Sequence, residues 1–273
     1  MNVQSLGYRT DLIFSRFEGE VTDRGDYLVV QTPSNPTYYW GNYLLFAQPP
    51  QVGDYARWRE QFIKEIGPNP PVKHMVFGID GTQGEIGEAA PFLEAGFEAD
   101  PSIILTAQTV HQPSKWNDRV SVRALESEAD WDQNLAVQIV CFQDDHEPAS
   151  YRVYAERSQN NYRAMIAAGL GQWFGAFEGD VLTASLGLFV QDGVGRFQAV
   201  VTHPDYRRRG ICGRLVYDVA RLGLTHMGAD VLVMAADPEY HAARIYESIG
   251  FVPAERQIGF QWVDKSLLST TES

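Results

Sequence analysis

The sequence has few cysteines and no long apolar run. Cys141 and Cys212 are the two cysteines among 273 residues, and neither lies at the spacing of a Cys-x-x-Cys pair or a zinc site. This argues against a disulfide framework and predicts that no metal is bound. No stretch approaches the roughly 18 apolar residues that a membrane span requires. The first residues resemble no signal peptide, so we expect a cytoplasmic protein without a membrane partner.

Positive charge is also scarce, because 22 Lys and Arg face 35 Asp and Glu, which gives a formal net charge of -13. Such a charge repels a phosphate backbone, and we therefore expect no nucleic-acid partner. Any anion that binds must be held by a local cluster of donors. An acidic surface suits a cationic small molecule such as an amine, although many acidic surfaces serve only solubility.

Apolar periodicity in the second half of the chain predicts alternating strands and helices. One helix has its apolar stripe at Leu135, Ile139 and Phe142, and another has its stripe from Ile211 to Leu222. The remaining predicted elements are strands at 120–123, 173–177, 182–190, 196–202, 231–234 and 258–263, and helices at 151–168 and 241–249. Short turns between the strands from 173 to 202 predict an antiparallel meander within a mixed α/β fold.

An arginine- and glycine-rich loop lies between the strand ending at Thr202 and the next helix. The first turn of a helix has unpaired N–H groups and the positive end of the helix dipole, so it can hold a phosphate group. Gly210 and Gly213 keep the backbone uncovered, and Arg207, Arg208 and Arg209 add charge-assisted hydrogen bonds. The loop predicts a site for a diphosphate. It has neither the G-x-G-x-x-G pattern of a dinucleotide fold nor the Gly-Lys-Ser/Thr of a P-loop.

The loop resembles the R/Q-x-x-G-x-G/A motif of the GCN5-related N-acetyltransferase (GNAT) family. Arg207, Gly210 and Cys212 stand at the three motif positions, and Cys212 is a small residue in place of the usual Gly or Ala. The segment 242–251 resembles the A-x-x-x-Y-x-x-x-G-F helix of the same family, with Tyr246 as its tyrosine. The resemblance covers about residues 120–263, slightly more than half of the chain.

The resemblance implies a GNAT fold, acetyl-CoA as the cofactor and acyl transfer to a primary amine. Tyr246 would be the general acid for the departing thiolate, although a tyrosine packed against the sheet is the commoner outcome for an isolated residue. The strand before the loop would offer backbone N–H groups. The cofactor-binding positions implied in this way are Val200, Val201, Thr202, Arg207, Arg208, Arg209, Gly210, Ile211, Cys212 and Gly213.

The acceptor amine is poorly specified by the sequence. The acidic segment 144–147 lies where the family builds much of its acceptor pocket, so Asp144 and Asp145 are weak candidates for contacts to a cationic substrate. Glu178 and Glu156 are candidate bases, and both suit solvated surface positions equally well. A small-molecule amine is a better candidate than a protein. The alternatives are a CoA-binding regulatory module without turnover and a structural or interaction protein in which both halves have lost function.

The sequence of the first half of the chain resembles a degenerate copy of the second half. A shift of 154 positions places Gly96-Phe97 on Gly250-Phe251, and it also places Ala56 on Gly210, Trp58 on Cys212 and Phe92 on Tyr246. The copy would lack the arginines, the glycine and the phenol. We therefore predict two tandem GNAT-like domains, with residues 1–110 degenerate, 111–118 a linker and 119–273 the N-acetyltransferase domain, and one cofactor per chain.

Overall fold

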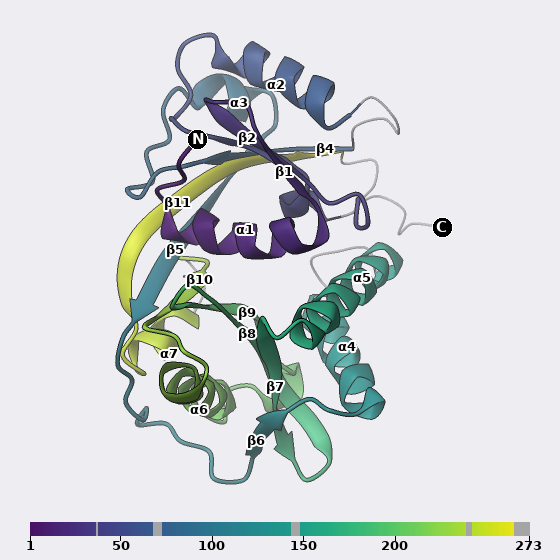
Figure 1. Ribbon diagram of the computed structural model, residues 1–273, viewed down its shortest axis with the longest axis vertical. Coiled ribbons are helices and arrows are strands. Elements are labelled where there is room, and N and C mark those ends of the chain that lie inside the picture. Colours follow the sequence, from purple (N-terminus) through teal and green to yellow (C-terminus); the bar gives the residue numbers. More distant parts are fainter. Residues whose placement is uncertain (37, 68–72, 143–147, 239–241, 265–273) are drawn as a thin grey trace. The chain divides into compact units, whose positions relative to one another are not determined.

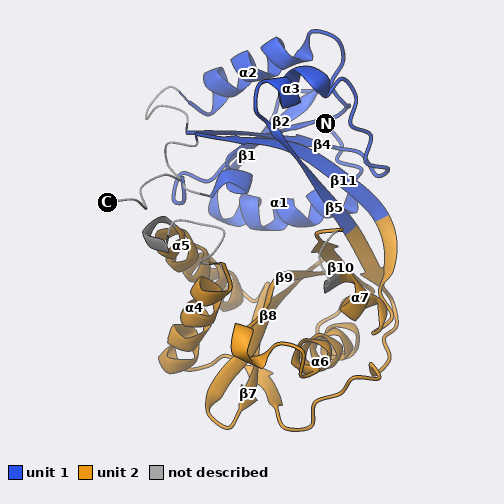
Figure 2. Cartoon of the chain, turned by 180° about the vertical axis from the view of Figure 1, so that it is seen from behind, with its two compact units in different colours: residues 1–103, 255–273 blue, residues 104–254 orange. Residues whose placement is uncertain are grey.

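The computed structural model describes residues 1–36, 38–67, 73–142, 148–238 and 242–264. The chain forms two compact units, one of residues 1–103 and 255–273 and the other of residues 104–254 (Figure 2). None of the helices within the described ranges is long and apolar enough to cross a membrane. The elements confirm the predicted mixed α/β class, with helices against sheets in both units (Figure 1).

The first unit begins with a helix and continues as a sheet. Its elements are α1 (Leu6–Glu18), β1 (Glu20–Asp23), β2 (Tyr27–Gln31), η1 (Tyr39–Gly41), β3 (Tyr43–Phe46), α2 (Asp54–Glu65), β4 (His74–Ile79), α3 (Ala90–Glu94) and the first part of β5 (Glu98–Ala107). Strands β1, β2 and β3 pair antiparallel in that order, and β3 pairs parallel to β4. On its other side β4 pairs antiparallel with β11 (Val252–Val263), where Phe260 lies opposite Phe77. The last strand of the chain thus completes the sheet of the first unit.

Alternate residues of these buried strands form two apolar cores, one on each face of the sheet. Trp58 and Phe62 of α2 and Phe92 of α3 pack with Phe46 and Phe77 on one face. On the other face, α1 contributes Tyr8 and Leu12, which pack with neighbouring side chains of β2, β3 and β4. Figure 1 shows α2 and α3 on the face opposite α1. The period-two alternation of strand side chains explains why one sheet carries both cores.

Two carboxylates hold the N-terminus of α1. The Asp80 carboxylate accepts hydrogen bonds from the backbone N–H of Gln4 and Ser5, each with an N···O distance of 2.8 Å. The Glu255 carboxylate accepts one from Leu6, also at 2.8 Å. Negative charge is favourable at a helix N-terminus, so these contacts tie α1 to both β4 and β11. The predicted domains, residues 1–110 and 119–273 with a linker at 111–118, are two copies of one fold, and this division stays a prediction.

The compact units are defined by contacts instead, and they place residues 255–273 in the first unit.

The second unit contains the predicted antiparallel meander. Its elements are β6 (Ser121–Ala124), α4 (Glu128–Phe142), α5 (Pro148–Ala167), β7 (Gly171–Glu178), β8 (Val181–Gln191), β9 (Val194–Thr202), η2 (Pro204–Tyr206), α6 (Ile211–His226), β10 (Val231–Ala236) and α7 (Ala242–Glu247). Strands β6 to β9 pair antiparallel in sequence order, and β9 pairs parallel to β10. Figure 1 shows α4 and α5 on one side of these strands and α6 and α7 on the other.

The buried face of α4 differs from the predicted one. Leu135 and Ile139 of the expected apolar stripe are only half-buried, while Asn134 and Gln138 are buried. The Asn134 side-chain oxygen accepts hydrogen bonds from Trp173 Nε1 at 3.1 Å and from Ser185 Oγ at 2.6 Å. The predicted stripe was wrong because polar side chains can occupy buried positions when strand residues supply their hydrogen-bond partners.

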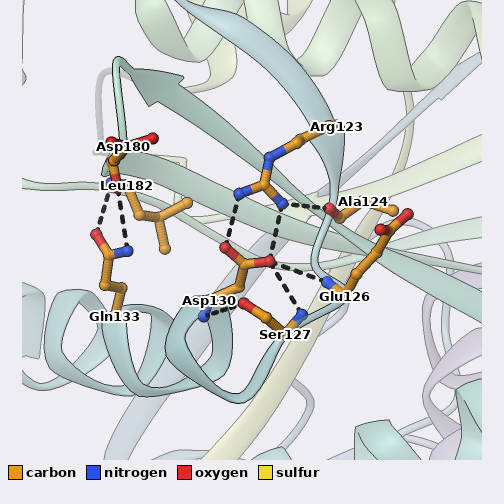
Figure 3. A network of polar contacts seen from close by, with 8 residues as sticks. All are labelled: Arg123, Ala124, Glu126, Ser127, Asp130, Gln133, Asp180 and Leu182. Atoms are coloured by element: carbon orange, nitrogen blue, oxygen red, sulfur yellow. Dashed lines mark hydrogen bonds and ion pairs between the residues drawn. The ribbon is translucent and has the colours of Figure 1, made fainter.

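The N-terminal end of α4 is fixed by a buried carboxylate (Figure 3). Asp130 is 5% exposed and receives two hydrogen bonds from the Arg123 guanidinium, at 2.8 and 2.7 Å. Its carboxylate also accepts from the backbone N–H of Glu126 and Ser127, and the Ser127 hydroxyl accepts from the N–H of Asp130 in a reciprocal capping arrangement. Arg123 and these backbone donors hold the pKa of the Asp130 carboxyl far below its usual range.

Asp130→Asn should lower the free energy of unfolding by about 1–3 kcal/mol at pH 7, because an amide oxygen accepts weaker hydrogen bonds than a carboxylate. The folded-state pKa of Asp130 is lowered, so its contribution to stability is full above its unfolded pKa of about 4 and decreases as the pH falls. The difference from wild type should therefore narrow between pH 7 and about pH 3. Urea unfolding at the two pH values measures this difference.

Glu128→Gln is the matched control for this measurement. Glu128 lies on the same helix and pairs with Arg163, but its side chain is 76% exposed. Exposed ion pairs contribute little to stability, so the control should change the urea midpoint little. Equal losses in the two variants would contradict the assignment of a special role to Asp130.

Candidate functional site

A β-bulge interrupts β9 shortly before its C-terminal end. Ser185 of β8 pairs with Val201, and Gly187 pairs with Gln198, so two residues of β9 lie opposite one residue of β8. Ala199, in this bulge, has a φ of 45°, a left-handed value that is strained for an alanine. Bulges and strained residues of this kind re-aim backbone groups and are common beside functional sites.

The pairing register decides which backbone groups of β9 face away from β8. The His203 N–H donates to the Thr183 carbonyl at 2.9 Å, and residue pairs in an antiparallel ladder alternate between bonded and non-bonded. Val201 is therefore bonded to β8, whereas the N–H of Thr202 points toward the opposite edge of β9. Val200 lies in the bulge, where this alternation is interrupted. The sequence had grouped Val200, Val201 and Thr202 together, and the alternation separates Val201 from Thr202.

The edge of β9 that faces away from β8 pairs with β10 only over the first residues of β9. Residues 194–196 of β9 pair with residues 231–233 of β10, although β9 continues to Thr202 and β10 continues to Ala236. Over the described part of both strands, no further residues of β9 and β10 pair with each other. The two strands part at this point, and the last residues of β9 present an open edge that runs toward the loop before α6.

Gly210 forms the N-cap of α6 at the end of that loop, with a φ of 78°. A Cβ atom on Gly210 would lie 2.9 Å from the Lys115 carbonyl oxygen, so both its backbone conformation and its surroundings require glycine. A Cβ atom on Gly213 would lie 3.3 Å from Pro113 Cγ. Ile211 is 2% exposed, and its side chain belongs to the core. Because the first backbone N–H groups of a helix have no partner within it, this turn can donate to an anion.

The three arginines are exposed, and two of them contact the loop itself. Arg207 Nε donates to the Thr202 carbonyl at 3.1 Å, and an Arg209 amino group donates to the Asp205 carbonyl at 2.6 Å. Arg208 has a φ of 64° at the turn into α6. Arg207 is thus held at the end of β9 and Arg209 within the loop, and the three arginines raise the local positive charge in an otherwise acidic protein.

Cys212 lies in the first turn of α6 and remains a thiol. Burial raises its pKa to about 11, and only a side-chain contact with Thr202 opposes this shift. A thiol with such a pKa is protonated at neutral pH and is a poor nucleophile. The role that the motif gives Cys212, a small residue that allows close approach to the helix, stays a prediction.

Tyr246 lies on α7 next to this turn. A Cβ atom on Gly213 would lie 3.8 Å from Ile245 Cγ2, which places α7 against the start of α6. Tyr246 is 4% exposed, and its ring lies 6.3 Å from that of Phe251, which contacts Phe197 of β9. The tyrosine is thus buried, and its ring is connected to β9 through Phe251. Whether its phenol donates a proton is not decided by this position and stays a prediction.

The candidate acidic residues are dispersed. Glu178 lies 4.0 Å from Arg209 through their charged groups, and Glu156 lies 3.6 Å from Arg152 on α5. Both carboxylates therefore have a cationic neighbour at half-exposed to exposed positions. Asp144 and Asp145 lie outside the described residues. Within the described part of the chain, no group of three or more His, Cys, Asp or Glu side chains is arranged to hold a metal ion.

Two residues near the site were missed by the sequence reasoning. Gln138 Nε2 donates to the Ala199 carbonyl at 3.3 Å, and Cys141 Sγ donates to the Thr202 carbonyl at 3.4 Å. Both lie on α4, where Gln138 is buried and Cys141 is half-buried. The available signal was the spacing of Asn134, Gln138 and Cys141 along one helix face, next to the apolar stripe that was predicted from the sequence.

In the first unit, the strands that correspond to β9 and β10 are β3 and β4, and they do not part. Strands β3 and β4 stay paired to the last residue of β3, where Phe46 lies opposite Ile79 and its carbonyl accepts from the Asp80 N–H at 2.8 Å. Trp58 stacks on Phe46 with 3.7 Å between ring centroids. Near the start of α2, the Asp54 carboxylate accepts from the Gln51 N–H at 2.9 Å. An aromatic stack and a carboxylate thus occupy the region that is open and cationic in the second unit.

One detail of the predicted repeat was wrong. The shift of 154 positions placed Ala56 on Gly210. In the structure, Gly53 is the left-handed N-cap of α2, with a φ of 91°, just as Gly210 is for α6. The first unit therefore has the glycine turn but not the three arginines before it, where Pro50, Gln51 and Val52 stand. A helix start needs the same backbone turn whether or not it binds an anion, which explains why the glycine remains.

Comparisons with known proteins agree with this geometry. The sequence model of the FR47-like protein family matches residues 173–260, which extend from β7 into β11. The sequence matches no curated protein at a significant level.

Solved structures show the same fold at low identity. A conserved protein of unknown function from Staphylococcus epidermidis is 14% identical, with a TM-score of 0.69 over 90% of this chain and 94% of that one. A GCN5-related N-acetyltransferase from Kribbella flavida is 13% identical, with a TM-score of 0.65 over 94% and 96%. A tandem GNAT protein from the clavulanic acid biosynthesis pathway is 11% identical, with a TM-score of 0.50 over 87% and 73%.

The parted strands and the glycine turn at α6 occur in a chain that shares its fold with a GCN5-related N-acetyltransferase along nearly its whole length. The chain has the GNAT fold, which it shares with a tandem GNAT protein, and its residues 173–260 are similar to the FR47-like family.

Proposed function

We propose that the protein is an N-acetyltransferase that transfers the acetyl group of acetyl-CoA to a primary amine. One observation carries the proposal: β9 parts from β10, and its open edge leads directly to the cationic start of α6. An extended chain with amide groups can pair with such an edge, and a diphosphate can be held at such a helix start. The two features together suit a pantetheine arm followed by a pyrophosphate.

The residues that fit this cofactor divide by role. The N–H groups of Val200 and Thr202 would bind the pantetheine arm and the acyl carbonyl, and Arg208 with the backbone N–H groups from Gly210 to Gly213 would bind the diphosphate. The cofactor supplies an acetyl group as a thioester. Cys212 is protonated and is not required as a nucleophile, so direct attack by the amine suits the site better than an acyl-enzyme.

The transfer forms a bond between the amine nitrogen and the acyl carbon and breaks the bond between that carbon and sulfur. The departing thiolate takes up a proton, and the nitrogen loses one to water or to a carboxylate. Tyr246 Oη is the proposed proton donor, because Tyr246 lies on α7 beside the start of α6. A backbone N–H at the bulge would stabilise the negative charge that develops on the carbonyl oxygen.

Arg208→Glu tests the cofactor site. Wild-type protein should bind one CoA per chain, and the variant should bind it about 10–100-fold more weakly, since a charge-assisted bond is lost and a repulsive charge is added. Isothermal titration calorimetry measures both the stoichiometry and the affinity.

Arg221→Glu is the matched control, because Arg221 is an exposed arginine further along α6 and its replacement changes the net charge equally. Its CoA affinity should stay within about twofold of wild type, as an exposed charge away from the site is screened. Two CoA molecules per chain, or equal effects of the two substitutions, would contradict the proposed site.

Tyr246→Phe tests the proton donor. Removal of a general acid should lower kcat by about 100-fold while CoA affinity stays near that of wild type. The fold should tolerate the change, because Phe92 occupies the related helix of the first unit and is fully buried there. The assay follows release of free thiol from acetyl-CoA with a panel of small primary amines. An unchanged kcat would remove Tyr246 from the mechanism.

The same assay distinguishes the enzyme from a regulatory module. Release of thiol above the rate of hydrolysis with any amine supports acetyl transfer. Tight CoA binding without such release over the whole panel would favour a module that binds CoA without turnover. Small amines are tested first, and a peptide with a lysine or a free N-terminus follows.

A further inference from the structure

We propose that Gln138 is a positioning residue that aims the backbone N–H of Val200 at the acyl carbonyl. This inference rests on the proposed function. Gln138 Nε2 donates to the Ala199 carbonyl at 3.3 Å, and it does so from α4, a helix that contributes no residue to the predicted cofactor set. The Ala199 carbonyl and the Val200 N–H belong to one peptide unit, and in a trans peptide they point in opposite directions. A side chain that holds the carbonyl therefore fixes the direction of the N–H.

The bulge makes this contact necessary. Ala199 has a φ of 45°, which is strained for an alanine, so neighbouring contacts must hold the peptide in place. Two residues of β9 lie opposite one residue of β8 at this point, and the regular ladder is interrupted. Gln138 supplies a hydrogen-bond donor to a carbonyl at the interruption. A hydrogen bond to the carbonyl also polarises the peptide, which makes the Val200 N–H a stronger donor.

The position of Gln138 is itself fixed by α4. Asp130 binds Arg123 beside the first turn of the helix, and Asn134 binds Trp173 and Ser185 one turn later. Gln138 follows at the same spacing of four residues, on the same helix face. It is 9% exposed, so its amide has little freedom to turn toward solvent. Three polar side chains in a row thus connect the edge of the meander to the bulge.

The experiment compares acetyl-CoA with CoA, because only acetyl-CoA carries the carbonyl that the Val200 N–H would bind. Wild-type protein should bind acetyl-CoA about three- to tenfold more tightly than CoA, the value of one good hydrogen bond. Gln138→Met keeps the length of the side chain and removes the donor. It should reduce the preference to nearly one, while CoA itself binds within about twofold of wild type. Calorimetry with both ligands gives the ratio.

Gln133→Met is the matched control on the same helix. Gln133 also bridges α4 to the sheet, through the Leu182 N–H at 2.9 Å and the Asp180 carbonyl at 3.2 Å, but at the β7–β8 turn. A general loss of helix packing would affect both variants alike. The preference for acetyl-CoA should therefore survive in Gln133→Met and be lost in Gln138→Met.

A second measurement uses wild-type protein and needs no variant to fold. The side-chain NH2 resonances of Gln138 should shift more when acetyl-CoA is added than when CoA is added, because the acyl carbonyl binds the other end of the same peptide. An NMR titration with each ligand provides this comparison. Equal shifts with the two ligands would overturn the positioning role.

The outcomes separate the two proposals. If wild type binds neither ligand, the proposed function fails and the positioning role falls with it. If wild type binds both ligands but shows no preference, or if Gln138→Met keeps the wild-type preference, the positioning role is overturned and the cofactor site stands. If Gln138→Met loses the preference for acetyl-CoA and Gln133→Met keeps it, the result supports both the cofactor site and the positioning role of Gln138.

Discussion

The separation of β9 from β10 is the constraint on which the rest of the site depends. Parallel strands normally satisfy each other's backbone groups along their shared length, and here the pairing stops after residues 194–196. The remaining N–H groups on that edge of β9 must find another partner or be solvated. The bulge at Ala199 and the contacts from α4 determine where these groups point, and the glycine turn at Gly210 determines what the edge leads to. The other features of the site act through this open edge.

The two units show what happens when the same strand order keeps or loses this opening. Strands β3 and β4 stay paired, and Phe46 of β3 stacks on Trp58 of α2 within the apolar core. The Asp54 carboxylate adds negative charge near the start of α2, although the turn at Gly53 is preserved. Backbone turns thus persist because the fold needs them, while charge and space are free to change. The first unit still has a structural part, since β11 completes its sheet and Glu255 binds the N-terminus of α1.

Much of the second unit could be predicted from the sequence, because apolar periodicity and short turns identify the meander, α6 and α7. The positions of Gly210 and Tyr246 followed from a motif with a physical reason for each residue. Other features carried no local signal. Ala199 gives no sign of a positive φ, and Gln138 on a buried helix face cannot be told from a solvated residue without its partner. The pairing of β11 with β4 depends on register between strands far apart in sequence, which periodicity does not encode.

Hydrogen exchange with and without CoA tests most directly whether one of the two related loops holds the cofactor. Backbone N–H groups that bind a ligand exchange more slowly, and the method reports each segment separately. We expect CoA to slow exchange over residues 199–213 and to leave residues 43–58 of the first unit unchanged. Slower exchange over residues 43–58, or no change over residues 199–213 at saturating CoA, would contradict the assignment of the open edge of β9 as the cofactor site.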